Sequence, residues 1–119
     1  MAQKFDLNEK TLAQVRPSGT GLVTLYEMVD AEKAVAKQLE ICNVGNGNET
    51  FSLHLDADGL VFDDTNALYK NHPIKRNETV SLDGKWWPID IKNAGFGIQA
   101  STANVLVFTL TGFELEQEA

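Results

Sequence analysis

Short runs of alternating apolar and polar residues, separated by turn-forming clusters, are the feature of this sequence that most limits its fold. The clearest run is Phe51 to Asp56, and the last one, Val105 to Phe113, has the same two-residue period. That period is typical of a strand with one buried face, because successive side chains of a strand point to opposite sides. The chain is therefore predicted to be all-β.

About eight such runs occur, with turn signals roughly every ten residues. The expected strands cover 12–16, 22–29, 34–42, 51–56, 67–69, 79–82, 95–100 and 105–113. Segment 34–42 is also rich in helix formers, but the Asn- and Gly-rich loop 43–48 follows it. We interpret it as a strand that forms a hairpin with 51–56. Pro73 places its own segment at an edge or bend.

The spacing of these strands favours a single-domain antiparallel β-sandwich, jelly-roll-like, with about eight strands. A chain of 119 residues supports one hydrophobic core. We expect an N-terminal arm over 1–11, where no clear period is visible, a β-sandwich domain over 12–114 and an acidic tail over 115–119.

The formal net charge of −7 argues against nucleic acid and anionic membranes as partners. The sequence contains no apolar run of signal-peptide or membrane-span length, so export by the general secretory route is not expected. Its one cysteine, Cys42, excludes an intrachain disulfide and the zinc patterns built from two cysteines.

Few residues are candidates for catalysis. His54 lies on the outward parity of its strand and His72 precedes Pro73, so both are expected at the surface. Cys42 is expected to be a small core residue, because no activating partner is evident. A cluster of Cys42, His54 and Asp56 would be the best trace of an active site, and strand parity is expected to separate the cysteine from the others. We predict no enzyme activity and no cofactor.

The acidic group in segment 56–64 is the candidate metal site, because aspartates beside a glycine can place oxygens around a hard cation. Its weak candidate ligands are Asp56, Asp58 and Asp63, with Asp64 next in sequence. The spacing does not fit an EF-hand loop, since Gly59 follows the second aspartate and apolar residues come after it. Turn chemistry explains these aspartates more simply.

Two adjacent tryptophans, Trp86 and Trp87, are the main candidates for protein contact. Neighbours in a strand or bend point to opposite faces, so one ring is expected in the core and the other partly exposed. An exposed tryptophan can anchor a protein partner or stack on a sugar. Phe5 and Leu7, the apolar residues of the expected arm, are further contact candidates.

Several segments resemble a family of small virion proteins of tailed bacteriophages, in order and spacing over roughly residues 12 to 114. The matching stretches are Leu12–Thr20, Leu25-Tyr26, Leu39–Asn43, Phe51–Gly59, Ala67–Tyr69, Pro73-Ile74, Asn77–Thr79, Ser101–Asn104, Phe108 and Gly112–Glu114. The family has a Pro-Ala-Gly-type turn where this chain has Val29–Glu32, and the Trp86-Trp87 region does not align. The resemblance implies a β-sandwich on the phage particle, as a capsid decoration (cement) protein or a tail or fibre component, without catalytic activity.

The leading hypothesis is therefore a non-enzymatic virion protein that decorates the capsid. It would bind the major capsid protein lattice, or other virion proteins, as a homo-oligomer. The first alternative is a tail or fibre adaptor. The second is a carbohydrate-binding module that uses the exposed tryptophan, with calcium at Asp56 and Asp58.

Overall fold

Nine antiparallel strands form the part of the chain described by the structure, a computed structural model that covers residues 3–29 and 31–117 and the side chains within 9–115. They are β1 (Gln3–Val15), β2 (Val23–Glu27), β3 (Lys33–Asn43), β4 (Glu49–Asp56), β5 (Ala67–Ile74), β6 (Thr79–Leu82), β7 (Trp87–Ile89), β8 (Gly95–Ala100) and β9 (Leu106–Gln117). Within these residues no helix is long and apolar enough to cross a membrane.

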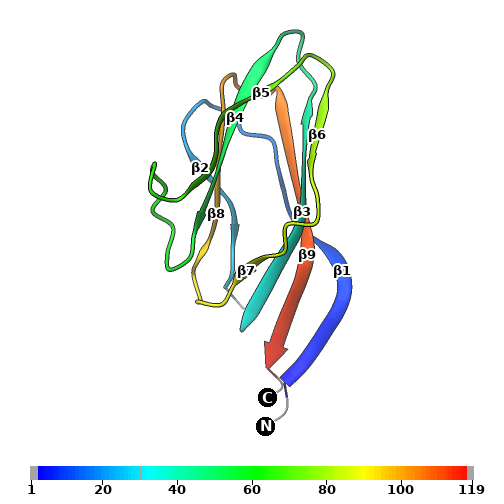
Figure 1. Ribbon diagram of the computed structural model, residues 1–119, viewed down its shortest axis with the longest axis vertical. Coiled ribbons are helices and arrows are strands. Elements are labelled where there is room, and N and C mark those ends of the chain that lie inside the picture. Colours follow the sequence, from blue (N-terminus) through cyan, green and yellow to red (C-terminus); the bar gives the residue numbers. More distant parts are fainter. Residues whose placement is uncertain (1–2, 30, 118–119) are drawn as a thin grey trace.

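The strands form two sheets that face each other (Figure 1). Sheet A has the order β1-β9-β3-β6, with β7 also paired to β3, and sheet B has the order β2-β8-β4-β5. If β6 and β7 are counted as one interrupted strand, the pairs β1–β9, β2–β8, β3–β6/β7 and β4–β5 are nested. Nested antiparallel pairs are those of a long hairpin rolled into two sheets, which is the jelly roll.

The prediction of an all-β antiparallel sandwich is confirmed, with one strand more than the expected eight. The additional strand is the short β7, which contains Pro88 and is absent from the expected strands. The expected boundaries after residues 11 and 114 fall inside β1 and β9. Backbone pairing extends beyond both boundaries, from Gln3 opposite Gln117 to Val15 opposite Phe108, with register shifts between Asp6 and Lys10 and between Thr11 and Ala13.

The predicted hairpin of 34–42 with 51–56 is wrong, because β3 belongs to sheet A and β4 to sheet B. The connection crosses between the sheets and is held by the buried side chain of Asn43. Its Nδ2 donates to the carbonyl oxygens of Gly47 at 2.9 Å, Ile74 at 3.3 Å and Lys75 at 3.2 Å. Its Oδ1 accepts from the Gly45 N–H at 3.0 Å. The Asn–Gly density of this loop therefore serves a crossover and not a tight turn.

The core lies between the sheets and contains side chains from both. Phe108 of sheet A and Phe51 of sheet B meet edge to face, with ring centroids 6.1 Å apart, and both are at most 1% exposed. At one end of the sandwich the Tyr26 hydroxyl of β2 donates a hydrogen bond to the Glu114 carboxylate of β9. Burial, together with this carboxylate, raises the pKa of Tyr26 far above its usual value. The two sheets are thus joined by packing and by a polar contact.

The outer face of sheet B is partly covered by the loop of residues 57–66, which leads from β4 to β5. Ser52, His54 and Asp56 point outward on β4, yet all three are at most 9% exposed. The ring of Phe62 lies over Gly97 of β8, where an added Cβ would be only 2.5 Å from Phe62 Cδ2. Because Gly97 has no side chain, the loop can lie close to the sheet.

Replacing Gly97 by Ala is expected to displace Phe62 and to lower the free energy of unfolding by about 1–3 kcal/mol, as for an overpacked site. Chemical denaturation measures this change. Gly19→Ala is the matched control, because nothing lies within 4 Å of a Cβ there, and it should change stability by less than about 0.5 kcal/mol.

A double-mutant cycle isolates the contact. In a Phe62→Ala background the Gly97→Ala change should lose most of its cost, since the ring that it meets is gone. Equal destabilisation in both backgrounds would show that Phe62 is not the obstacle.

Candidate functional site

The connection between β6 and β7, residues 83–86, links two strands that both pair with β3 and carries Trp86. It is anchored by the Lys85 N–H, which donates to the Lys37 carbonyl of β3 at 3.3 Å. Gly84 and Trp86 both have positive φ, 69° and 54°. A bulky residue in the left-handed region costs on the order of 1–3 kcal/mol and persists only where its surroundings hold it.

The indole of Trp86 is held by contacts on sheet A and remains 53% exposed. It stacks on Phe113 of β9, with ring centroids 6.0 Å apart and planes inclined by 17°. The Lys37 ammonium lies 5.5 Å from the centroid of the indole, within the range of a cation–π interaction. Lys37 is in turn ion-paired with Glu9 of β1. We call Trp86, Phe113, Lys37 and Glu9 the Trp86 platform.

Trp87 has the opposite environment from its neighbour. It is partly buried and packs against the core, with its ring centroid 5.7 Å from that of Phe96 and the planes inclined by 61°. Trp86 is therefore the tryptophan available for contact. The other two contact candidates, Phe5 and Leu7, lie in β1, where Phe5 is opposite Leu115, and their side chains are outside the described part.

The aspartates of loop 57–66 and of the adjoining end of β4 accept hydrogen bonds from the loop itself. Asp56 accepts from the N–H groups of Asp58 at 3.2 Å and Val61 at 2.9 Å. Asp63 accepts from both the N–H and the hydroxyl of Thr65. These are the bonds of turn-forming aspartates.

Hydrogen bonds in this loop also shift the pKa values of its aspartates. A hydrogen bond between the carboxyl groups of Asp56 and Asp58 lowers the pKa of Asp56 and raises that of Asp58, and the Thr65 hydroxyl lowers the pKa of Asp63. Among the residues whose side chains are described, no three His, Cys, Asp or Glu residues form a group able to hold a metal ion.

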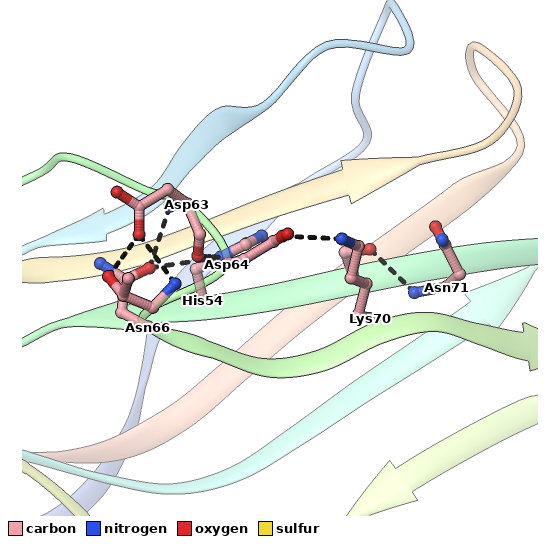
Figure 2. Close-up of polar contacts among 8 residues, drawn as sticks. His54, Asp63, Asp64, Asn66, Lys70 and Asn71 are labelled. Carbon is pink, nitrogen blue, oxygen red and sulfur yellow. Dashed lines mark hydrogen bonds and ion pairs between the residues drawn. The ribbon is translucent and has the colours of Figure 1, made fainter.

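His54 is not the surface residue that strand parity predicts, since it is only 4% exposed beneath the loop. Figure 2 shows it beside Asp63 and Asn66, with Nδ1 at 3.0 Å from the Asp63 carbonyl oxygen and 3.3 Å from Asn66 Oδ1. A carbonyl oxygen only accepts, so Nδ1 carries the proton. His54 therefore fastens the loop to the sheet.

The three residues considered as a possible active site, Cys42, His54 and Asp56, do not form a cluster. Cys42 belongs to β3 in sheet A, whereas His54 and Asp56 belong to β4 in sheet B. Cys42 is also not fully buried, since its side chain is of intermediate exposure. On this strand the buried polar position belongs to the next residue, Asn43, which is 1% exposed.

Comparison with known proteins identifies a fold and no family. Neither protein-family models nor curated proteins match the sequence. A chain in the capsid structure of Helicobacter pylori bacteriophage KHP30 superposes with a TM-score of 0.57 at 12% identity, covering 99% of both chains. The coat protein of Tobacco streak virus has a TM-score of 0.49 at 14% identity, over 94% of this chain and 87% of that one. At 12% identity the likeness to the KHP30 chain shows the fold alone, which is the jelly roll.

The acidity of Asp63 provides a test of this loop. Thr65→Val removes the hydroxyl donor, so the pKa of Asp63 should rise toward its ordinary value. Because the folded pKa is lowered, Asp63 stabilises the fold above the unfolded carboxyl pKa, and this contribution is lost as pH falls through the folded pKa. NMR titration of the side-chain carboxyl groups measures the change.

Thr102→Val is the reciprocal control, because the Thr102 hydroxyl is the main cause of the lowered pKa of Glu49. It should raise the pKa of Glu49 and leave Asp63 unchanged, whereas Thr65→Val should do the reverse. Failure of Asp63 to respond to Thr65→Val would contradict the assigned hydrogen bonds.

Proposed function

We propose that this chain is a non-enzymatic structural protein of a virion, and specifically a capsid decoration protein that binds the lattice of the major capsid protein. The observation that carries the proposal is the end-to-end agreement with a chain of the phage KHP30 capsid. Coverage of 99% of both chains means that the two have nearly the same length. The match is thus to a whole small capsid chain and not to one domain of a larger one.

The physical character of the chain supports this role. Its net charge of −7 suits contact with basic protein surfaces. A protein present in many copies on a symmetric shell gains avidity from the array, so each interface can be small. A catalytic centre is not needed for such a role.

The Trp86 platform supplies the contact surface in this proposal. Tryptophan is enriched among the residues that dominate protein–protein binding energy. Trp86 is held in a costly backbone conformation with half its surface exposed. The exposed part of the indole buries no apolar area within this chain, whereas a partner that covers it would bury that area. This favours a role for the indole in contact with another molecule.

Mass spectrometry and cryo-electron microscopy of purified particles from the virus that encodes this chain test the role. We expect the chain in hundreds of copies, with a jelly-roll density on the capsid lattice. Tens of copies or fewer, located at the tail, would support a tail or fibre adaptor instead. Absence from the particle would refute both structural roles.

Rebinding of purified protein to capsids that lack it tests the surface. Trp86→Asn removes the indole while keeping a residue that tolerates positive φ, and it should weaken binding at least about tenfold, as expected for a hot spot. Val44→Asn is the control, because Val44 has a nearly equal exposure of 54% and lies elsewhere. If Trp86→Asn binds capsids as tightly as the control Val44→Asn does, the platform is excluded from the interface. The virion role is not excluded by that result.

A further inference from the structure

The outer face of sheet B carries a depression of about 260 Å³ beside the part that loop 57–66 covers. Its position follows from the register, because the pair Ser52–Gln99 lies next to the covered pair His54–Gly97. We call it the sheet B depression. Residues of β4, β5 and β8 form it together with two loop residues, Thr20 and Ser101. Its lining consists of Thr20, Thr50, Phe51, Ser52, Asn71, Gln99, Ala100 and Ser101.

The lining is neutral and rich in hydrogen-bonding groups. None of its eight residues is charged, and six of them carry a hydroxyl or a carboxamide. Such groups both donate and accept hydrogen bonds. Phe51 is only 1% exposed, so the depression does not present an aromatic face. Recognition here would come from hydrogen bonds.

Internal hydrogen bonds fix the walls of the depression. Asn71 has a φ of 50° at an irregularity in the β4–β5 pairing, and its N–H donates to Ser52 Oγ at 3.0 Å. Across the depression, Gln99 Nε2 donates to the Thr20 carbonyl at 2.9 Å. A bulge that redirects a side chain is a common device at binding sites. The shape is therefore set before any ligand arrives.

Several polar groups remain available for a ligand. Within the described part of the chain, the hydroxyls of Thr20 and Thr50, the carboxamide of Asn71 and Oε1 of Gln99 have no hydrogen-bond partner. The Ser101 hydroxyl, in contrast, already has two partners, since it accepts from the Thr50 N–H and donates its proton to Glu49. The free groups include both donors and acceptors.

We propose that the sheet B depression binds a single neutral sugar residue. Vicinal hydroxyls of a sugar also donate and accept, and so complement this set of groups. The depression is smaller than the roughly 300 Å³ at which pockets for drug-sized ligands begin, which suits one ring. The ionised Glu49 behind Ser101 and the net charge of −7 disfavour phosphate and acidic sugars.

This site goes beyond the structural role and is independent of it. Ligands of this size bind with dissociation constants on the order of millimolar. Many copies on one particle would convert such weak binding into useful avidity for a glycan-bearing surface. The binding itself is a property of the isolated protein and is tested on it.

The test is an NMR titration of the purified chain with glucose, galactose, mannose and N-acetylglucosamine, each compared with glucuronic acid. We expect saturable amide shifts at Thr50, Ser52, Asn71, Gln99 and Ser101 with at least one neutral sugar. Glucuronic acid should bind more weakly than the neutral sugar that it resembles, glucose, if glucose binds.

Two variants assign the shifts to the depression. Asn71→Gly removes the carboxamide but keeps both the positive φ and the bond to Ser52, and Thr50→Val removes a hydroxyl without changing shape. Each should weaken binding by about five-fold, the effect of losing one hydrogen bond. Thr24→Val on the exposed edge strand β2 is the control and should bind as the unmodified chain does.

The proposal is overturned if none of the four neutral sugars causes saturable shifts at these amides. It is also overturned if the shifts occur at the Trp86 platform instead, or if Asn71→Gly and Thr50→Val both bind as tightly as Thr24→Val. None of these results bears on whether the chain is found in the particle.

Discussion

Strand β9 is the element on which the rest of the structure depends, because it is hydrogen-bonded along both of its edges. It pairs with β1 on one side and with β3 on the other, so the first and the last strand are fixed beside each other. The β1–β9 pair is the outermost of the nested pairs of the jelly roll, and all the other pairs lie inside it. Non-local pairing of this kind carries a large loop-closure cost, which the shared interior around Phe51 and Phe108 offsets.

The alternation in the sequence identified the strands well because it reports which side chains avoid water. It could not report which strand lies beside which. For 34–42 and 51–56, a loop of Asn and Gly was consistent with either a hairpin or a crossing between sheets. The outcome depended on Asn43, whose amide bonds carbonyls more than thirty residues away, and local patterns do not contain that information.

The same limit applies to the candidate site residues. Strand parity placed His54 outward correctly, but exposure also depends on whether a loop returns over that face, and here Phe62 and Gly97 bring it there. For the tryptophans, alternation indicated two different environments. The partners Phe113 and Lys37 and the positive φ of Trp86 are tertiary features. The residues of the sheet B depression also come together only in the fold.

The two broad sides of the sandwich differ in chemistry, and this difference has a geometric consequence. One side bears stacked aromatic rings, and the other bears uncharged hydroxyls and amides beside a fastened loop. A slab attached through one broad side necessarily displays the other. A subunit seated on a shell by its aromatic side would turn its hydroxyl-rich side to the surroundings, so that anchoring and recognition of the exterior would never compete for the same surface.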